Sequence, residues 1–455
     1  MVDHKVLVVG TGKSGIGAAK LLGKAGAIPV LYDDNVNLDK EAIKKSAGEI
    51  TDLEVVLGEV PQKEKKEISL IVLSPGVPID APMLKEYRER SIPIWGEIEL
   101  AYAFEKGSVI AITGTNGKTT TTTLVGQIMD AYYKSVFVVG NIGNPYTDIA
   151  CETEADSVTV AEISSFQLET IHRFHPKVSA ILNITPDHLN RHHTMECYVQ
   201  TKEVVSMNQT KQDTCVLNYE NEYTKAFGER CHAKVIYFSS ARVLQEGVFL
   251  QGEDIYMATA EIDGGVAKRL MNIHDMNLVG MCNVENVMAA IAIGYAMKVP
   301  MELILKTIRE FQAVEHRIEF VATKKGVDYY NDSKGTNPDA AIQGIKAMSK
   351  PTLLIAGGYD KGSEYDEWIE AFDHKVKALV LIGQTRDKIA ACAREHGVDN
   401  IILADSLEEA FSICTSQAKP GDAVLLSPAC ASWGMFPNYE VRGRQFKELV
   451  EKIGA

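Results

Sequence analysis

The sequence predicts an α/β protein with three domains, each built on its own mainly parallel sheet. Three groups of short β-branched runs alternate with helical stretches, a pattern typical of parallel strands covered by helices. Each group also carries a glycine-rich or Ser-Pro turn directly after a strand, where open α/β sheets bind their ligands. The length of 455 residues fits about three domains of ~100–200 residues each.

The domain boundaries are expected near Trp95 and Phe311. Residues 1–95 are expected to form a Rossmann-like domain, residues 96–311 a central P-loop-type mononucleotide-binding domain, and residues 312–455 a second Rossmann-like domain. The strands are expected at residues 5–10, 29–34 and 70–76, then 109–114, 135–141, 157–162 and 179–185, and finally 351–358, 377–383 and 422–428. The apolar stretch 286–297 is expected to be a buried core helix.

Composition excludes several classes of function. A net charge of -14, from 61 acidic and 47 basic residues, argues against a nucleic-acid-coating protein. The eight cysteines include no C-x-x-C pair, which suits free thiols in a reducing compartment. The first expected strand begins at Lys5, leaving no room for a signal peptide, and no apolar run reaches the ~20 residues that span a bilayer. We therefore expect a cytoplasmic monomer without nucleic-acid partners or membrane insertion.

The first chemical signal lies at the start of the chain. Gly10, Gly12 and Gly15 follow a β-branched strand with the G-x-G-x-x-G spacing of a dinucleotide site, and Asp33 and Asp34 come about 20 residues later. Taken alone, this pattern favours an NAD-dependent oxidoreductase.

The strongest signal opens the second group, in the stretch VIAITGTNGKTTTTT. A hydrophobic strand leads into a glycine-containing loop and then a helix, so backbone N–H groups can bind phosphate oxygens. Lys118 would neutralise phosphate charge and the Thr119 hydroxyl would bind Mg²⁺. Ile112 stands where the usual motif has its first glycine. The expected ATP-binding loop comprises Gly114, Thr115, Asn116, Gly117, Lys118, Thr119 and Thr120.

Further metal-binding side chains are expected at neighbouring strand ends. Glu162 ends one expected strand, and Asp187 and His188 follow another. If the strands are parallel, all three lie at the same edge as the phosphate loop, and carboxylates there suit a Mg²⁺-nucleotide site. The alternatives are that Glu162 caps a helix and that His188 is an ordinary surface residue.

Eight motifs, in order along the whole chain, carry a family resemblance. They are TGTNGKTTTT, AEISSFQLE, NITPDHLNRH, NVENVMAA, HRIE, NDSKGTNPDA, GGYDKG and LSPACASWGMFPNYEVRGRQF. This series resembles the Mur ligases of peptidoglycan synthesis. The S-P-A-C-A-S stretch and the short first domain favour the branch that adds D-glutamate.

The resemblance implies an ATP-dependent, amide-forming reaction. The terminal carboxylate of UDP-N-acetylmuramoyl-L-alanine would take the γ-phosphoryl group of ATP, and the amine of D-glutamate would attack the resulting acyl phosphate. A carboxylate is a poor electrophile because its leaving group would be oxide, whereas an acyl phosphate expels phosphate. Lys118 and Mg²⁺ would neutralise the clustered negative charge.

The resemblance also implies two Mg²⁺ sites. Thr119 and Glu162 would bind the metal beside the phosphates, and His188 a second ion. Lys202 matches a lysine that is carbamylated in the family, so that a cation becomes a carboxylate-like metal ligand. The implied catalytic residues are therefore Lys118, Glu162, His188 and Lys202. The residues alone would favour a solvated lysine at position 202.

Other ligand sites follow from the same resemblance. Cys282 stands where the family usually has histidine, and Tyr439 where phenylalanine is common. The implied additional ATP contacts are Asn283, Asn286, His316, Arg317 and Asp332. The implied D-glutamate contacts are Lys334, Thr336, Lys361, Ser432 and Tyr439, and those for the UDP-substrate are Lys13, Ser14, Asp33, Asp34, Gly76, Asn141, Ser164 and His188.

Two other classes of function would each explain part of the sequence. An NAD-dependent oxidoreductase would explain the first 35 residues but leaves GTNGKT, DSKGTN and SPACAS without a role. A non-enzymatic nucleotide-binding switch would explain Lys118 and Thr119, but it would not need the lysines and serine of the last third of the chain. On the resemblance, the opening glycine turn binds the diphosphate of UDP, and no nicotinamide is needed.

Overall fold

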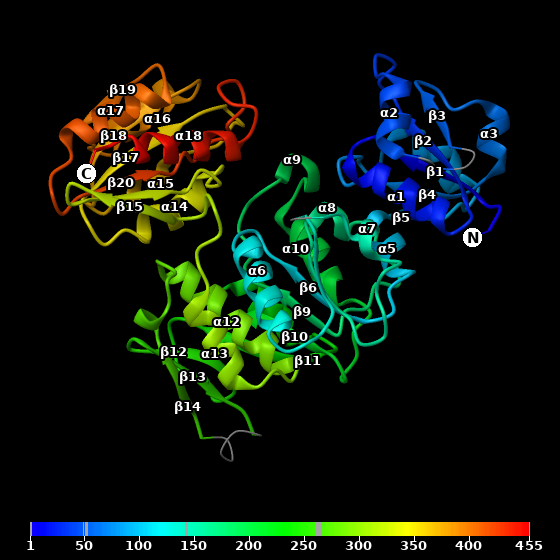
Figure 1. Ribbon diagram of the computed structural model, residues 1–455, viewed down its shortest axis with the longest axis horizontal. Coiled ribbons are helices and arrows are strands. Elements are labelled where there is room, and N and C mark those ends of the chain that lie inside the picture. The colour runs from blue at the N-terminus through cyan, green and yellow to red at the C-terminus, as the bar shows by residue number, and fades with distance from the viewer. Residues whose placement is uncertain (1, 49, 51–52, 142–143, 261–265, 455) are drawn as a thin grey trace. The chain divides into compact units, whose positions relative to one another are not determined.

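The computed structural model describes residues 2–48, 50, 53–141, 144–260 and 266–454, and these form three sheets covered by helices (Figure 1). The predicted α/β class is confirmed. The chain forms two compact units. One consists of Met1–Met271 with Val287–Ile308, and the other of Asn272–Asn286 with Arg309–Ala455. The boundaries near Trp95 and Phe311 stay a prediction.

The first sheet is parallel and has the strand order β3-β2-β1-β4-β5. Its central strand is the apolar run KVLVV, which is buried from Val6 onward because neighbours flank it on both sides. The strands are β1 (Lys5–Val9), β2 (Ile28–Asp33), β3 (Glu54–Leu57), β4 (Ile68–Leu73) and β5 (Ile94–Gly96). The helices are α1 (Lys13–Lys24), α2 (Lys40–Ala47), α3 (Gln62–Glu67), η1 (Pro82–Leu84) and α4 (Lys85–Glu89).

The second sheet has nine strands in the order β14-β13-β12-β11-β10-β9-β6-β8-β7. All four strands expected here form, although β9 ends at Ile181 rather than residue 185. Strands β10–β14 were not predicted, because their apolar runs are short, as in TCVLN and GVFLQ. The strands are β6 (Ser108–Thr113), β7 (Val136–Gly140), β8 (Val158–Glu162), β9 (Val178–Ile181), β10 (Thr214–Asn218), β11 (Lys234–Ser239), β12 (Gly247–Gln251), β13 (Asp254–Ala258) and β14 (Lys268–Asn272).

The helices around this sheet include the apolar helix α12, whose residues 287–293 are fully buried, as expected for a core helix. It packs against α13 so closely that a Cβ on Gly294 would lie 2.8 Å from Ile304 Cδ1. Among the described residues, no helix is long and apolar enough to cross a membrane. The helices are α5 (Glu97–Tyr102), α6 (Lys118–Asp130), α7 (Tyr146–Ile149), α8 (Ser165–Leu168), α9 (Leu189–His192), α10 (Met195–Glu203), η2 (Val204–Ser206), α11 (Glu222–Gly228), η4 (Ile273–Asp275), α12 (Met281–Ala296) and α13 (Met301–Glu310).

The third sheet has the order β15-β16-β20-β17-β18-β19 and is parallel except for the pair β15 and β16. This antiparallel hairpin was not predicted. The strands are β15 (Glu319–Lys324), β16 (Val327–Asn331), β17 (Thr352–Gly357), β18 (Val376–Ile382), β19 (Ile401–Leu403) and β20 (Ala423–Leu426). The helices are α14 (Pro338–Lys346), α15 (Asp366–Glu370), α16 (Arg386–Glu395), α17 (Leu407–Gln417) and α18 (Tyr439–Glu451).

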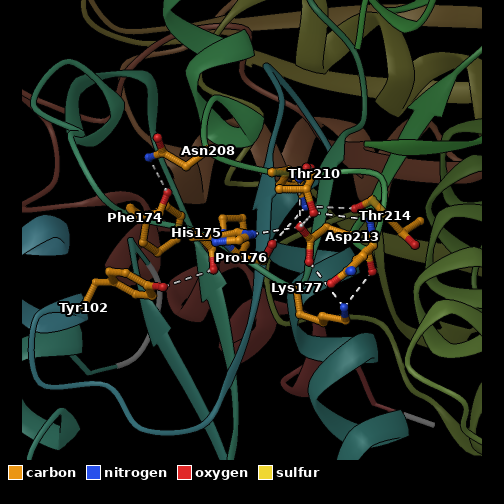
Figure 2. Close-up of polar contacts among 12 residues, drawn as sticks. Tyr102, Phe174, His175, Pro176, Lys177, Asn208, Thr210, Asp213 and Thr214 are labelled. Carbon is orange, nitrogen blue, oxygen red and sulfur yellow. Dashed lines mark hydrogen bonds and ion pairs between the residues drawn. The ribbon is translucent and has the colours of Figure 1, made fainter. Parts of the chain in front are cut away.

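A polar network ties together the amino ends of β9 and β10 (Figure 2). The Asp213 carboxylate accepts hydrogen bonds from His175 Nε2 at 2.8 Å, from the Thr210 amide at 2.8 Å and from the Thr210 hydroxyl at 2.9 Å. Lys177 Nζ lies 3.3 Å from its other oxygen. Burial alone would raise the pKa of Asp213, but the hydrogen bonds from His175, Thr210 and Lys177 lower it to about 2.

We expect Asp213→Asn to destabilise the protein near neutral pH by about 2 kcal/mol, because the native state favours the ionised carboxylate. This stabilisation is present above the unfolded-state pKa of ~3.9 and is lost as the pH falls toward 2. Denaturant unfolding at several pH values measures it. The exposed Asp156 provides the control Asp156→Asn. Equal loss of stability in the two variants would contradict the prediction.

Candidate active site

The phosphate loop joins the carboxyl end of β6 to the start of α6 and has the backbone of an anion site. Gly114 and Gly117 adopt positive φ angles of 153° and 85°. A Cβ on Gly114 would lie 3.1 Å from Leu182 Cβ and 3.3 Å from the Asn116 carbonyl oxygen. The loop therefore requires glycine, and the amino end of α6, which starts at Lys118, lies directly beside it, as in helix-terminal anion sites.

Residues after β9 hold this loop in place. Asn183 accepts from the Asn116 amide at 2.8 Å and donates to its carbonyl at 3.1 Å. The Thr115 hydroxyl lies 3.1 Å from both the Thr185 carbonyl oxygen and the Tyr198 hydroxyl. Asn183 was missed by the sequence analysis, although it lies inside the quoted motif NITPDHLNRH. Its position just after a strand next to β6 was the available signal.

Two lysines converge on one carbonyl of the loop. Lys118 Nζ lies 2.8 Å from the Gly114 carbonyl oxygen, and Lys202 Nζ lies 2.9 Å from the same atom. The expectation of a solvated Lys202 is wrong, because this side chain is buried and lies over the Tyr198 ring. Burial lowers the pKa of Lys202 well below its usual range, and the Lys118 charge lowers it further against the opposing effect of Asp187.

Glu162 lies at the same sheet edge, at the end of β8, which pairs in parallel with β6. Asn141 Nδ2 donates to Glu162 Oε1 at 2.9 Å. Glu162 Oε2 is buried and has no hydrogen-bond partner among the described residues. The capping alternative is wrong, since Ser164 caps the next helix, α8. A buried carboxylate oxygen without a donor fits a cation ligand beside the phosphate loop.

Thr119 and Thr120 lie in the first turn of α6 and are both buried. Within the described chain, Thr120 Oγ1 lacks a hydrogen-bond partner. These hydroxyls therefore lie at the amino end of the helix, where the sequence analysis expects phosphate and metal contacts.

His188 lies in the connection between β9 and α9, at the amino end of α9, with a positive φ of 55°. Its side chain is about half exposed, its Nε2 lies 3.6 Å from Asp187 Oδ2, and its ring packs on Phe166 at 4.9 Å between centroids. The parallel pairing of β6 with β9 puts Asp187 and His188 at the edge of the sheet that carries the phosphate loop. The predicted parallel pairing of these strands is confirmed, and the metal-binding role of His188 stays a prediction.

A group of polar residues next to His188 in the chain, centred on His192 and Arg191, was not predicted from the sequence. His192 is buried, with Nε2 2.9 Å from Ser165 Oγ and Nδ1 3.7 Å from Glu169 Oε1. Arg191 donates to both Glu169 oxygens, at 2.6 and 3.2 Å. Burial, together with the charges of His188 and Lys202, lowers the pKa of His192 to about 4, so it is neutral near pH 7. The pair Arg-His in NITPDHLNRH was the only sequence signal.

The first glycine turn is as tight as its sequence predicts. A Cβ on Gly15 would lie 1.8 Å from the Gly10 carbonyl oxygen, so only glycine fits. The turn is also bonded to β2, because Thr11 Oγ1 donates to Asp33 Oδ2 at 2.8 Å. Asp34 is exposed.

The other expected UDP contacts have different surroundings. Lys13 is exposed at the start of α1. Gly76 is exposed, and its carbonyl oxygen lies 3.5 Å from Arg191 Nη1. Burial raises the pKa of Glu97, against hydrogen bonding by Ser14 and Gln167. Gln167 also accepts from the Ser164 hydroxyl at 2.9 Å.

In the second unit, HRIE forms a strained turn. His316 and Ile318 have positive φ angles of 67° and 46°, which is unusual for a β-branched residue such as Ile318. His316 Nδ1 lies 2.9 Å from Asn331 Nδ2, and a Cβ on Gly443 would come within 2.3 Å of the same ring nitrogen. His316 Nε2 and Arg317 Nε are buried without hydrogen-bond partners in the described residues.

Asp332 is buried beside this turn. Its oxygens accept from the Ile318 amide at 3.2 Å and the Ser427 hydroxyl at 2.8 Å. Burial raises the pKa of Asp332 to about 6, with Arg317 opposing the shift. The three expected ATP contacts of this unit, His316, Arg317 and Asp332, therefore belong to one connected cluster.

Arg442, which was not predicted, binds the loops that carry the expected D-glutamate residues Lys334 and Ser432. Its guanidinium is fully buried and donates to the hydroxyl and carbonyl of Ser333 at 3.0 and 2.8 Å and, less closely, to the Cys430 carbonyl at 3.4 Å. The Ser333 hydroxyl donates to the Tyr439 carbonyl, and Lys334 Nζ lies 5.6 Å from the centre of the Tyr439 ring. Burial lowers the pKa of Arg442 to about 10.

The remaining expected D-glutamate residues have different exposures. Lys361 is exposed, with Nζ 5.3 Å from the centre of the Trp433 ring. Ser432 is buried next to that tryptophan in the chain, and Thr336 is half-buried. A bridge between Tyr359 and Ala431 brings the backbones of the two loops together.

The asparagine pair lies in the first turns of α12. Asn286 Nδ2 donates to Asn283 Oδ1 at 3.1 Å, and Asn283 donates to the Val279 carbonyl at 2.8 Å. Burial raises the pKa of the Cys282 thiol to about 12, with Arg317 opposing the shift. The Cys282 thiol is therefore close enough to Arg317 and Asp332 to be affected by their charges.

Family comparisons match successive parts of the chain. The matching descriptions are "Mur ligase MurD-like, N-terminal domain" for residues 4–96, "Mur ligase middle domain" for residues 112–294 and "Mur ligase, glutamate ligase domain" for residues 316–430.

The chain is also similar to curated proteins over nearly its whole length. It is 58% identical over 451 residues to a UDP-N-acetylmuramoylalanine–D-glutamate ligase of Lachnospira eligens, covering 99% of each chain. It is 46% identical over 450 residues to a protein of the same name from Clostridioides difficile, covering 99% of this chain and 98% of the relative.

Solved structures share the fold at much lower identity. UDP-N-acetylmuramate-alanine ligase MurC from Thermotoga maritima matches with a TM-score of 0.60 and 17% identity, over 98% of this chain and 99% of the other. MurF from Acinetobacter baumannii matches with a TM-score of 0.61 and 16% identity, over 98% and 93% of the two chains. At such identities the likeness concerns the fold.

Proposed function

Because this chain belongs to the Mur ligase family, we propose that it joins D-glutamate to UDP-N-acetylmuramoylalanine, forming an amide bond and ADP during synthesis of a peptidoglycan precursor. The observation that carries the proposal is a glycine-dependent phosphate loop whose lysine lies beside a buried lysine, at the sheet edge that also holds Glu162. The cytoplasm is the proposed location, where ATP is available.

Lys118 is the proposed phosphate-binding cation. Its ammonium lies on the Gly114 and Thr115 carbonyl oxygens, at 2.8 Å from each, so it is held at the loop before ATP binds. Transfer of the γ-phosphoryl group to the substrate carboxylate would give an acyl phosphate, and the D-glutamate amine would displace phosphate from it. Lys118 would stabilise the negative charge on the oxygens of the γ-phosphoryl group during its transfer.

Mg²⁺ is the proposed metal, and the residues fit it. Thr119 and Glu162 would hold one ion, a role supported by the unpartnered Glu162 Oε2, while His188 and Lys202 are assigned to a second. When bound, Mg²⁺ would neutralise phosphate charge and polarise the transferred group. The chain's own contribution is to hold these side chains at one sheet edge.

Carbamylation of Lys202 is proposed because a buried ammonium is a poor neighbour for a metal and for Lys118. The lowered pKa of Lys202 favours the neutral amine, which is the form that attacks CO₂. The amine nitrogen would bond to the carbon of CO₂ and lose a proton to solvent, leaving a carbamate with one negative charge. The carbamate would place a negative charge beside the Lys118 ammonium, so the two side chains would attract each other.

The substrate sites are proposed on the three domains 1–95, 96–311 and 312–455. The glycine turn after β1 would bind the UDP diphosphate, with Lys13, Ser14, Asp33, Asp34, Gly76, Asn141, Ser164 and His188 around the substrate. ATP would contact Gly114–Thr120, Asn283, Asn286, His316, Arg317 and Asp332. D-glutamate, with its two carboxylates, would contact Lys334, Thr336, Lys361, Ser432 and Tyr439.

Phosphate release tests this function. We expect ATP hydrolysis that requires both D-glutamate and UDP-N-acetylmuramoylalanine, with one amide product per ADP formed. Hydrolysis that ignores either substrate would favour a nucleotide switch. Substrate-dependent change in nicotinamide absorbance would instead favour an oxidoreductase.

Lys361→Ala should raise KM for D-glutamate about tenfold or more, because an ion pair to a substrate carboxylate is lost, while KM for ATP stays near its original value. Steady-state kinetics with each substrate varied in turn measures both constants. Lys346→Ala, at another exposed lysine of the same unit, is the matched control. An equal rise in both KM values would remove Lys361 from the D-glutamate site.

A further inference from the structure

Two helices of the second unit present four possible metal ligands to each other. Asp366 and Glu370 are four residues apart on α15, while Cys392 on α16 and His396 at its carboxyl end are also four apart. This spacing puts each pair on one helical face. None of the four has a role in the ligase reaction proposed above.

The side chains converge on one point. The ligand atoms of Asp366, Cys392 and His396 all lie within 4.8 Å of one another. His396 Nε2 is 3.0 Å from Asp366 Oδ1, and His396 Nδ1 is 3.9 Å from Glu370 Oε1. Zinc–ligand bonds of ~2.0–2.3 Å in a tetrahedron put neighbouring ligand atoms ~3.3–3.8 Å apart, so only small rotations are needed.

A thiolate, an imidazole and a carboxylate form a ligand set that suits Zn²⁺ and similar transition metals, whereas Mg²⁺ prefers oxygen ligands. We propose that Asp366, Cys392 and His396 bind one divalent cation of the Zn²⁺ class, with Glu370 as the positioning carboxylate on the other ring nitrogen of His396. Metal-bound histidines commonly have such a carboxylate partner. Water would take the fourth position, which it can reach through a hollow lined by Glu370, His374 and His396.

The metal-free site carries one more proton than the metal-bound site, on the Cys392 thiol. A cysteine binds a metal as its thiolate, so the Cys392 thiol must lose its proton when the cation binds. Binding of the cation replaces this proton, which goes to solvent. The metal then joins α15 to α16 and stabilises the second unit.

Cobalt titration of the full-length protein in saturating Mg²⁺ tests the site, because excess Mg²⁺ occupies the oxygen-rich ligase site. We expect one equivalent of Co²⁺ to give a thiolate-to-cobalt charge-transfer band, which Zn²⁺ then removes by displacing the cobalt. The band should persist in Cys151→Ser, which changes an exposed thiol elsewhere, and disappear in Cys392→Ser. Co²⁺ affinity should fall at least tenfold in His396→Gln.

Glu370→Gln separates positioning from ligation, since it should lower affinity by about 10–100-fold and leave the band in place. Zn²⁺ should also raise the Tm of the parent protein and not that of Cys392→Ser. Absence of the band in the parent, or its persistence in Cys392→Ser, overturns the proposal. Neither result depends on ligase activity, so the test is distinct from that of the proposed function.

Discussion

Replacing Lys118 with alanine is expected to lower kcat for ADP formation by about 1,000-fold, the loss that follows removal of a preorganised donor to a transition-state charge. Lys118 holds its ammonium on the Gly114 and Thr115 carbonyl oxygens, inside a loop whose backbone is fixed by glycine and by Asn183. No other side chain of the loop carries a positive charge. Phosphate release at saturating substrates measures the effect.

Lys134→Ala is the control for this variant, since Lys134 is an exposed lysine just past the other end of α6. Its kcat should stay within about twofold of the parent, and the Tm of both variants should remain close to the parent value. A Lys118→Ala protein that keeps more than a fifth of the parent kcat would exclude Lys118 from the reaction.

Lys202→Arg is expected to lower kcat by about 100-fold or more, because arginine stays cationic and cannot form a carbamate. The variant keeps a long cationic donor near the Gly114 carbonyl oxygen, which the parent lysine contacts at 2.9 Å. Loss of activity would therefore result from the positive charge of residue 202 in the variant, rather than from a missing hydrogen bond to Gly114.

Direct detection of the carbamate accompanies the kinetics. The parent protein equilibrated with ¹³C-bicarbonate should show a carbamate signal in its ¹³C spectrum that disappears on acidification, and Lys202→Arg should lack it. Lys211→Ala, at an exposed lysine, should retain it. A fully active parent with an unmodified Lys202 amine at a metal-bound site would refute the modification.

Repeating short apolar runs were sufficient to predict the α/β class and the strands that hold the ligand loops. The phosphate loop, for example, follows directly from a buried strand, Gly114 and Gly117. Strands β10–β14 and the β15–β16 hairpin escaped prediction because their apolar runs are short, and periodicity alone does not separate such runs from buried helix segments.

The site was predictable where a residue type has few structural uses, as with Lys118 after a glycine turn. It was not predictable where a residue acts through contacts distant in the chain. Asn183 and Arg442 are ordinary polar residues in sequence, and their importance comes from carbonyls and amides that only folding brings near them. Burial of Lys202 belongs to the same class, since its helix α10 has no apolar pattern that predicts it.

The buried Arg442 guanidinium also has a consequence for biosynthesis. The loops that carry Lys334 and Ser432 both depend on an arginine that the ribosome adds late, at position 442 of 455. Until α18 has left the exit tunnel, the Ser333 and Cys430 carbonyls lack their charged donor. We therefore expect a nascent chain to complete its phosphate loop well before its D-glutamate site. A message truncated before codon 442 should yield a polypeptide without a complete D-glutamate site.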